Sequence, residues 1–159
     1  MTRKTLSLKV KRKKDAVPVD KHVEQSAAVD PQKLFLNGIA VHPSQCIQLE
    51  LGSKQLSMRA MDLITPIGMG QRGLIVAPPG CGKTTMLKHI CQSVGNAYPE
   101  VKLYALLIDE RPEEVTDFTR SVPAEVHASS SDEGYAKHVR VANKLLNQAQ
   151  KQAGEGHDV

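Results

Sequence analysis

The residues best suited to chemistry lie between positions 73 and 86, in the sequence GLIVAPPGCGKTTM. A lysine and two hydroxyl residues, Lys83, Thr84 and Thr85, follow a turn rich in proline and glycine. Glycine lets a backbone approach a ligand closely, and a helix that begins after such a turn directs unpaired N–H groups and its positive dipole end at an anion. A lysine supplies charge for the outer phosphates, and a threonine hydroxyl binds Mg²⁺. This pattern predicts a nucleotide phosphate site.

The elements on either side of this turn fit the same interpretation. Residues 74–77 form an apolar run that predicts a buried parallel strand, and residues 83–94 have the spacing of a helix with one apolar face. Ala77 departs from the generic pattern G-x-x-x-x-G-K-[ST], which has glycine there, but the strand and helix context argues against a chance match. We expect ATP and Mg²⁺ to bind here, with Thr84 as the metal ligand. The residues assigned to the nucleotide are Pro79, Gly80, Cys81, Gly82, Lys83, Thr84 and Thr85.

A second set of candidate residues follows the most apolar run of the chain, residues 103–108, which predicts another buried parallel strand. That run ends in Asp109, Glu110 and Arg111, and Pro112 then opens a helix expected to end near residue 121. Ligands of open α/β sheets bind at the carboxyl ends of strands, so Glu110 and Arg111 are catalytic candidates. The alternative is an ion pair that caps the following helix.

The remaining pattern predicts an α/β protein in which helices flank a parallel sheet. A Ser130–Glu133 capping box precedes an amphipathic helix that ends at Gly154. The apolar face of that helix is expected to consist of Tyr135, Val139, Ala142, Leu146 and Ala149. Short strands are expected at residues 34–36, 47–51 and 124–128, a helical turn at 60–64, and the start of another strand at 157–159.

Charge divides the chain of 159 residues into two parts. Residues 1–33 hold nine Lys and Arg against four Asp and Glu, whereas residues 34–159 hold twelve against thirteen. We interpret residues 1–33 as a disordered basic arm that contacts RNA phosphates, with a solubilising tail as the alternative, and residues 34–159 as the folded domain. The sequence has no apolar run long enough to span a membrane, and its three cysteines have no metal-binding spacing. A reduced, cytoplasmic location is therefore expected.

Three segments together resemble the bacterial transcription termination factor Rho family: PIGMGQRGLIVAPPGCGKTTML, LLIDERPEEVTDF and HASSSDEGYAKHVRVA. The resemblance implies a RecA-like P-loop NTPase domain that works as a ring hexamer, translocates along RNA and acts on transcription complexes of RNA polymerase. Lys83 and Thr84 match the family's phosphate-binding lysine and Mg²⁺-binding threonine. Glu110 matches the glutamate that activates the attacking water, and Arg111 matches an arginine that organises the site.

The chain also departs from the family's pattern. It shows neither the family's N-terminal RNA-binding domain, nor the strand that bears the Mg²⁺-linked aspartate of Walker B, nor the arginine finger. We therefore expect residues 34–159 to be a partial Rho-like ATP-binding domain that hydrolyses ATP weakly or not at all. The alternative is a non-catalytic protein that binds RNA or joins the rings of a Rho relative. A small kinase-type phosphotransferase is disfavoured, because no arginine-rich lid segment is present.

Overall fold

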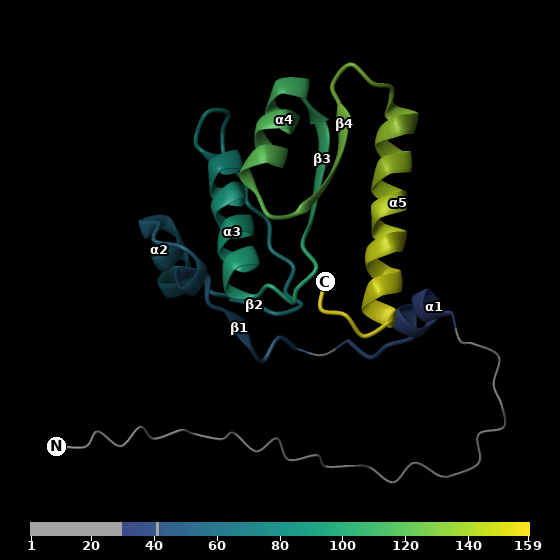
Figure 1. The fold of residues 1–159 in the computed structure, drawn as a ribbon, viewed down its shortest axis with the longest axis horizontal. Coiled ribbons are helices and arrows are strands. Elements are labelled where there is room, and N and C mark those ends of the chain that lie inside the picture. Colours follow the sequence, from purple (N-terminus) through teal and green to yellow (C-terminus); the bar gives the residue numbers. More distant parts are fainter. Residues whose placement is uncertain (1–29, 41) are drawn as a thin grey trace, which may run out of the picture.

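The computed structural model describes residues 30–40 and 42–159, so the predicted basic arm lies almost entirely outside the described residues. Two parallel strands, β3 (Tyr104–Glu110) and β4 (Glu125–Ser130), form the centre of the fold. Helices α3 (Lys83–Ala97) and α4 (Pro112–Ser121) cover one face of this sheet, and α5 (Tyr135–Gly154) covers the other (Figure 1). The predicted α/β class with a parallel sheet and flanking helices is confirmed.

The β3–α4–β4 unit forms where the sequence predicts it. Pro112 occupies the first turn of α4, where its missing N–H has no helical partner to lose, and acidic residues in that turn favour the helix dipole. Phe118 of α4 and Val122, the residue that follows this helix, are buried against Ala105 of β3, together with half-buried apolar side chains of α3 and of both strands. This cluster is one of two small cores that hold the fold together.

The second core joins α3 to the segment that precedes it. Leu49 lies in a short 3₁₀ helix (Leu49–Gly52), and Met58 lies in α2 (Leu56–Ile64). Both are almost fully buried against Val94 of α3. The predicted strand at residues 47–51 is wrong beyond Ile47, because the Asp62 carboxylate accepts hydrogen bonds from the backbone N–H groups of Leu49 (3.1 Å) and Glu50 (2.9 Å). Those two N–H groups are therefore not available to a strand ladder, and only β1 (Cys46–Ile47) pairs, antiparallel, with β2 (Ile67–Gly68).

Helix α1 (Pro31–Leu36) replaces the strand predicted at residues 34–36. Asp30 caps it by accepting a hydrogen bond from the Gln32 N–H group (3.1 Å), and Pro31 occupies its first turn, so local signals favour a helix. The helix lies against the C-terminal end of α5 (Figure 1). The approach is close: a Cβ on Gly154 would lie 1.8 Å from the Pro31 carbonyl oxygen.

Two predicted helices differ from the structure in detail. Helix α3 continues through Gly95 and ends at Ala97, two residues before Pro99. A Cβ at position 95 would lie 2.5 Å from Cγ of Pro123, so glycine allows the helix to approach Pro123 closely. On α5 the buried residue is Leu145, whereas Leu146 is 54% exposed and Tyr135 is 80% exposed. The predicted apolar face of α5 is therefore displaced by about one residue.

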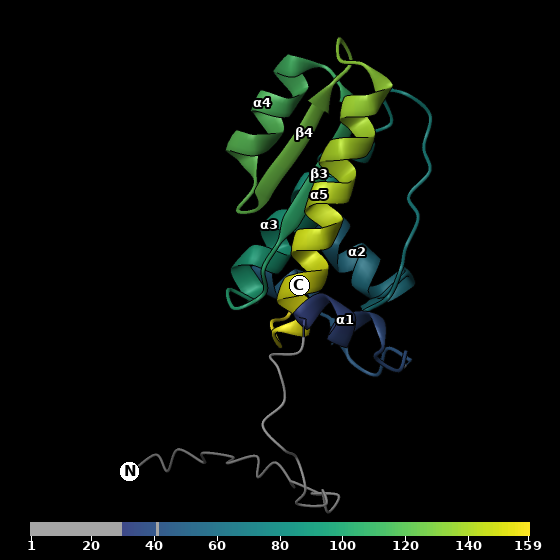
Figure 2. The same ribbon diagram turned by 90° about the vertical axis from the view of Figure 1, so that its right-hand side faces the viewer.

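The strand predicted at residues 74–77 does not form. Leu74 is 88% exposed and Val76 is 81% exposed, and residues 71–78 run as an extended coil from the end of β2 toward α3 (Figure 2). A strand needs a neighbour for its backbone N–H and C=O groups, and within the described residues β3 pairs with β4 alone. Residues 157–159, predicted to begin another strand, are also irregular, although the Asp158 carbonyl accepts a hydrogen bond from the Lys102 N–H group (2.9 Å).

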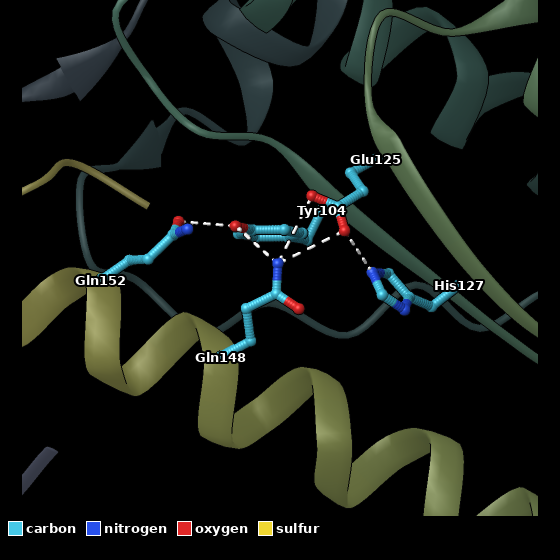
Figure 3. A network of polar contacts seen from close by, with 5 residues as sticks. All are labelled: Tyr104, Glu125, His127, Gln148 and Gln152. Atoms are coloured by element: carbon cyan, nitrogen blue, oxygen red, sulfur yellow. Dashed lines mark hydrogen bonds and ion pairs between the residues drawn. The ribbon is translucent and has the colours of Figure 1, made fainter.

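Polar side chains fasten α5 to the sheet (Figure 3). The Tyr104 hydroxyl donates to the Gln152 side chain (2.5 Å), and the Gln148 amide donates to Tyr104 (3.3 Å) and to Glu125 (3.3 Å). The Glu125 carboxylate also pairs with the His127 ring (2.8 Å). Except for Glu125 and His127, these partners lie 23 or more residues from one another along the chain. The network could therefore not be recognised from the sequence.

In the turn between β4 and α5, one of the two hydrogen bonds of the predicted capping box forms. The Glu133 carboxylate accepts a hydrogen bond from the Ser130 N–H group (3.1 Å), but α5 begins only at Tyr135 and Gly134 precedes it. Buried Ser129 donates to the same carboxylate (3.0 Å) and contacts the His138 ring (2.6 Å).

Among the described helices, none is both long enough and apolar enough to cross a membrane.

Candidate functional site

A cavity of about 540 Å³ lies where the N-terminus of α3 faces the carboxyl end of β3. One wall is the turn before α3, and the other wall carries two carboxylates, from the last residue of β3 and the first turn of α4. The lining residues are Ala77, Pro78, Pro79, Gly80, Gly82, Lys83, Thr84, Thr85, Glu110 and Glu114.

The geometry of the turn leaves backbone donors available at the cavity. Gly80 (φ 78°) and Gly82 (φ 80°) both adopt the left-handed conformation, which glycine reaches without strain. No side chain caps α3, whose N-terminal flanking residue is Gly82, so the N–H groups of its first turn have no side-chain acceptor. These donors and the positive end of the helix dipole make the turn a ready anion site.

The structure brings together most of the residues predicted from the sequence. Pro79, Gly80, Gly82, Lys83, Thr84 and Thr85 line the cavity together with Glu110. Cys81 and Arg111 do not line it. Cys81 is exposed between the two glycines, and Arg111 is exposed at the residue before α4, where its carbonyl accepts a hydrogen bond from Val115 N–H (3.0 Å).

Sequence reasoning missed Glu114. A signal for it existed, because a residue in the first turn of a helix that begins at the end of β3 must lie near the carboxyl end of that strand. Ala77 and Pro78 were also missed as lining residues, although they belong to the same turn.

The two carboxylates of the cavity affect one another. Burial raises the pKa of Glu110, the neighbouring Glu114 carboxyl raises it further, and the Lys83 ammonium opposes this by lowering it. A carboxyl with a raised pKa takes up a proton more readily than an ordinary glutamate, as a base that receives a proton from water must. Neither Glu110 nor Arg111 forms an ion pair within the described residues, so the alternative of a capping ion pair receives no support there.

A P-loop-type turn at the N-terminus of a helix, facing acids at the end of a parallel strand, defines the class of nucleotide-binding α/β domains. The comparison with known families agrees: the profile of the ATP synthase alpha/beta family, nucleotide-binding domain, matches residues 57–154. The chain belongs to this family.

Within that family the chain is similar to transcription termination factor Rho, as its three characteristic segments predicted. It is 47% identical to Rho of Karelsulcia muelleri over 132 residues, covering 83% of this chain and 35% of that relative. It is 47% identical to Rho of Haemophilus influenzae and 49% identical to Rho of Neisseria gonorrhoeae, each over 129 residues, covering 79% of this chain and 31% of each relative. The chain thus spans about a third of the length of these curated relatives.

Proposed function

We propose that this chain binds ATP with Mg²⁺ as the nucleotide-binding segment of a Rho-like, RNA-dependent ATPase of transcription termination. The observation that carries the proposal is the cavity in which an uncapped helix N-terminus and Lys83 face Glu110 and Glu114. The positive wall suits a polyphosphate, and the acidic wall suits a metal ion or a water molecule. The similarity to proteins named transcription termination factor Rho supports the choice of family function.

The phosphate-binding role falls on the turn and on Lys83. Gly80 and Gly82 have no atom within 4 Å of the position that a Cβ would take, so the space beside them is open to a ligand. Backbone N–H groups there would donate to phosphate oxygens, and the Lys83 ammonium would neutralise part of their charge. Pro79, Cys81 and Thr85 shape the same turn.

The donor atoms of the cavity fit Mg²⁺. The Thr84 hydroxyl and the carboxylates of Glu110 and Glu114 are oxygen donors, which Mg²⁺ prefers, and they lie around one space with Lys83. We assign the direct contact to Thr84. When bound with ATP, Mg²⁺ would supply positive charge between the outer phosphates and so stabilise the charge that develops during phosphoryl transfer.

We assign Glu110 to the attacking water. Its carboxylate stands at the end of β3, across the cavity from the phosphate turn, and its raised pKa suits a group that orients water and accepts its proton. The exposed Arg111 is proposed to organise the site when nucleotide is present. Glu114 would share the acidic wall and influence the charge of Glu110.

The remaining assignments follow the Rho family. We propose a RecA-like domain at residues 34–159, assembly into a ring hexamer, contact with RNA polymerase and a cytoplasmic location. RNA phosphates would contact the basic residues within positions 1–33, where nine Lys and Arg stand against four Asp and Glu.

A titration of the full chain with a fluorescent ATP analogue tests nucleotide binding. Lys83→Ala is expected to weaken affinity at least about tenfold, which corresponds to about 1.4 kcal/mol. The matched control is Lys54→Ala, which removes an exposed lysine on a loop outside the cavity and should leave affinity unchanged. Equal affinities for the parent and Lys83→Ala would refute the proposed site. RNA-stimulated phosphate release, measured in parallel, should be weak or absent for this chain, and robust release that is lost in Lys83→Ala would contradict that expectation.

A further inference from the structure

The last residues of β3 break the regular pairing with β4. Leu106 pairs with His127 and Ile108 pairs with Ser129, but the next pair joins Glu110 to Ser130. One residue of β3, Asp109, is left without a partner, and it is the only non-glycine residue with positive φ (61°) among residues 30–40 and 42–159. An extra residue in the left-handed conformation opposite a continuous strand is a β-bulge.

The bulge changes which face of the sheet Glu110 occupies. Side chains alternate along a strand: Ala105 and Leu107 pack toward α3 and α4, whereas Tyr104 bonds to side chains of α5. Strict alternation from Tyr104 would place residue 110 on the α5 face. Glu110 instead lines the cavity with Lys83 and Thr84 of α3, and the single extra residue accounts for this reversal.

We infer that Asp109 is a positioning residue, whose left-handed backbone directs the Glu110 side chain into the cavity. The inference deepens the proposed function and rests on it. Asp and Asn are among the few non-glycine residues that adopt this conformation at modest cost, whereas a β-branched residue is strongly disfavoured. The position of Asp109 thus requires a property that few side chains have.

Neighbouring contacts hold the bulge in place. The Glu110 carbonyl accepts a hydrogen bond from the Ser131 N–H group (3.0 Å), and the Ser130 N–H group donates to the Glu133 carboxylate (3.1 Å). Before the bulge, Ile108 pairs with Ser129 in the β3–β4 ladder. The chain is therefore held on both sides of Asp109, so the conformation of Asp109 decides the direction of Glu110.

A thiol introduced by Glu110→Cys reports the direction of this side chain. The full chain carrying Glu110→Cys is treated with N-ethylmaleimide, with and without Mg²⁺ and a non-hydrolysable ATP analogue, and each modified cysteine is identified by peptide mass mapping. At an analogue concentration of about ten times Kd, bound nucleotide should slow modification of the introduced thiol about tenfold. Titration of each variant with a fluorescent ATP analogue is the control for nucleotide binding, and half-buried Cys91 reports whether the variant is folded.

Four changes at position 109 are then compared in that background. Asp109→Gly and Asp109→Asn permit positive φ and should retain nucleotide protection of the introduced thiol. Asp109→Val and deletion of Asp109 should abolish this protection while the fluorescent ATP analogue still binds and Cys91 stays slow to react.

Three outcomes would overturn the inference. The first is continued protection of the introduced thiol in a folded Asp109→Val or deletion variant. The second is unfolding of both variants, detected by rapid modification of Cys91, which would give Asp109 a structural role in place of a positioning role. The third is failure of the parent chain to bind the fluorescent ATP analogue, which would refute the proposed nucleotide site and the inference with it.

Discussion

The glycine at the start of α3 permits a sharp test of the phosphate turn. Gly82 has φ 80°, and a Cβ built on it meets no atom within 4 Å. In Gly82→Ala the methyl group therefore causes no steric clash, and the cost to the folded state comes from the left-handed conformation alone, about 1–2 kcal/mol. Such a loss should lower the melting temperature by about 3–8 °C.

A second glycine separates this backbone strain from ligand binding. Gly70 has almost the same conformation (φ 81°) and the same open surroundings, but it does not line the cavity. Gly70→Ala and Gly82→Ala should therefore lose similar stability. Gly82→Ala alone should also lose nucleotide affinity, by about tenfold or more, because its methyl group projects into space proposed for phosphates and the strained turn reorients its N–H donors.

Two measurements on each variant decide the matter: thermal unfolding without nucleotide, and a titration with a fluorescent ATP analogue. If Gly82→Ala binds the analogue as tightly as Gly70→Ala does, the turn is not the phosphate site. If Gly82→Ala is destabilised much more than Gly70→Ala, the assumption that only backbone conformation matters at Gly82 is wrong.

Three further results are expected. N-ethylmaleimide should modify exposed Cys81 much faster than Cys91, because burial raises the pKa of the Cys91 thiol and shields it; equal rates by mass mapping would contradict the described packing. Asp62 accepts two backbone hydrogen bonds, one of them from a buried residue, so Asp62→Ala should lower the free energy of unfolding in urea by about 2–4 kcal/mol. Asp62→Asn keeps one acceptor oxygen and should lower it by about half as much. Hydrogen bonds from His127 and Gln148 lower the pKa of Glu125, so the ionised carboxylate stabilises the fold above its unfolded pKa of about 4.5 and this effect is lost as the pH falls. The melting temperature of Glu125→Gln should therefore fall less than that of the parent chain between about pH 6 and pH 3. An equal fall in both chains would contradict this.

Local signals explain what could be predicted from the sequence. The proline and acids at the start of α4, the apolar run of β3 and the glycines of the phosphate turn each act within a few residues, and the structure places all three as expected. The candidate site is a combination of these elements, which is why Lys83, Thr84 and Glu110 could be brought together before the fold was known.

The remaining differences arise from contacts between residues distant in the chain. The run at residues 74–77 has the composition of a strand, but a strand exists only with a neighbour. Periodicity could not choose between Leu145 and Leu146, because adjacent leucines lie only about 100° apart around a helix. The bulge at Asp109 had no local signal, since aspartate also occurs in turns and caps; only the pairing with β4 reveals it.

Helix α1 and the phosphate turn lie at opposite ends of the molecule. Helix α5 has 20 residues, so its ends lie about 30 Å apart, and Pro31 touches its C-terminal end at Gly154. The phosphate turn lies at the opposite end of the sheet, beside the carboxyl ends of the strands (Figure 1). A small partner bound to α1 would thus not touch the nucleotide directly. Any influence between them would be allosteric, carried through α5 and the sheet, and equal in both directions: the partner would change nucleotide affinity by the same factor by which nucleotide changes affinity for the partner.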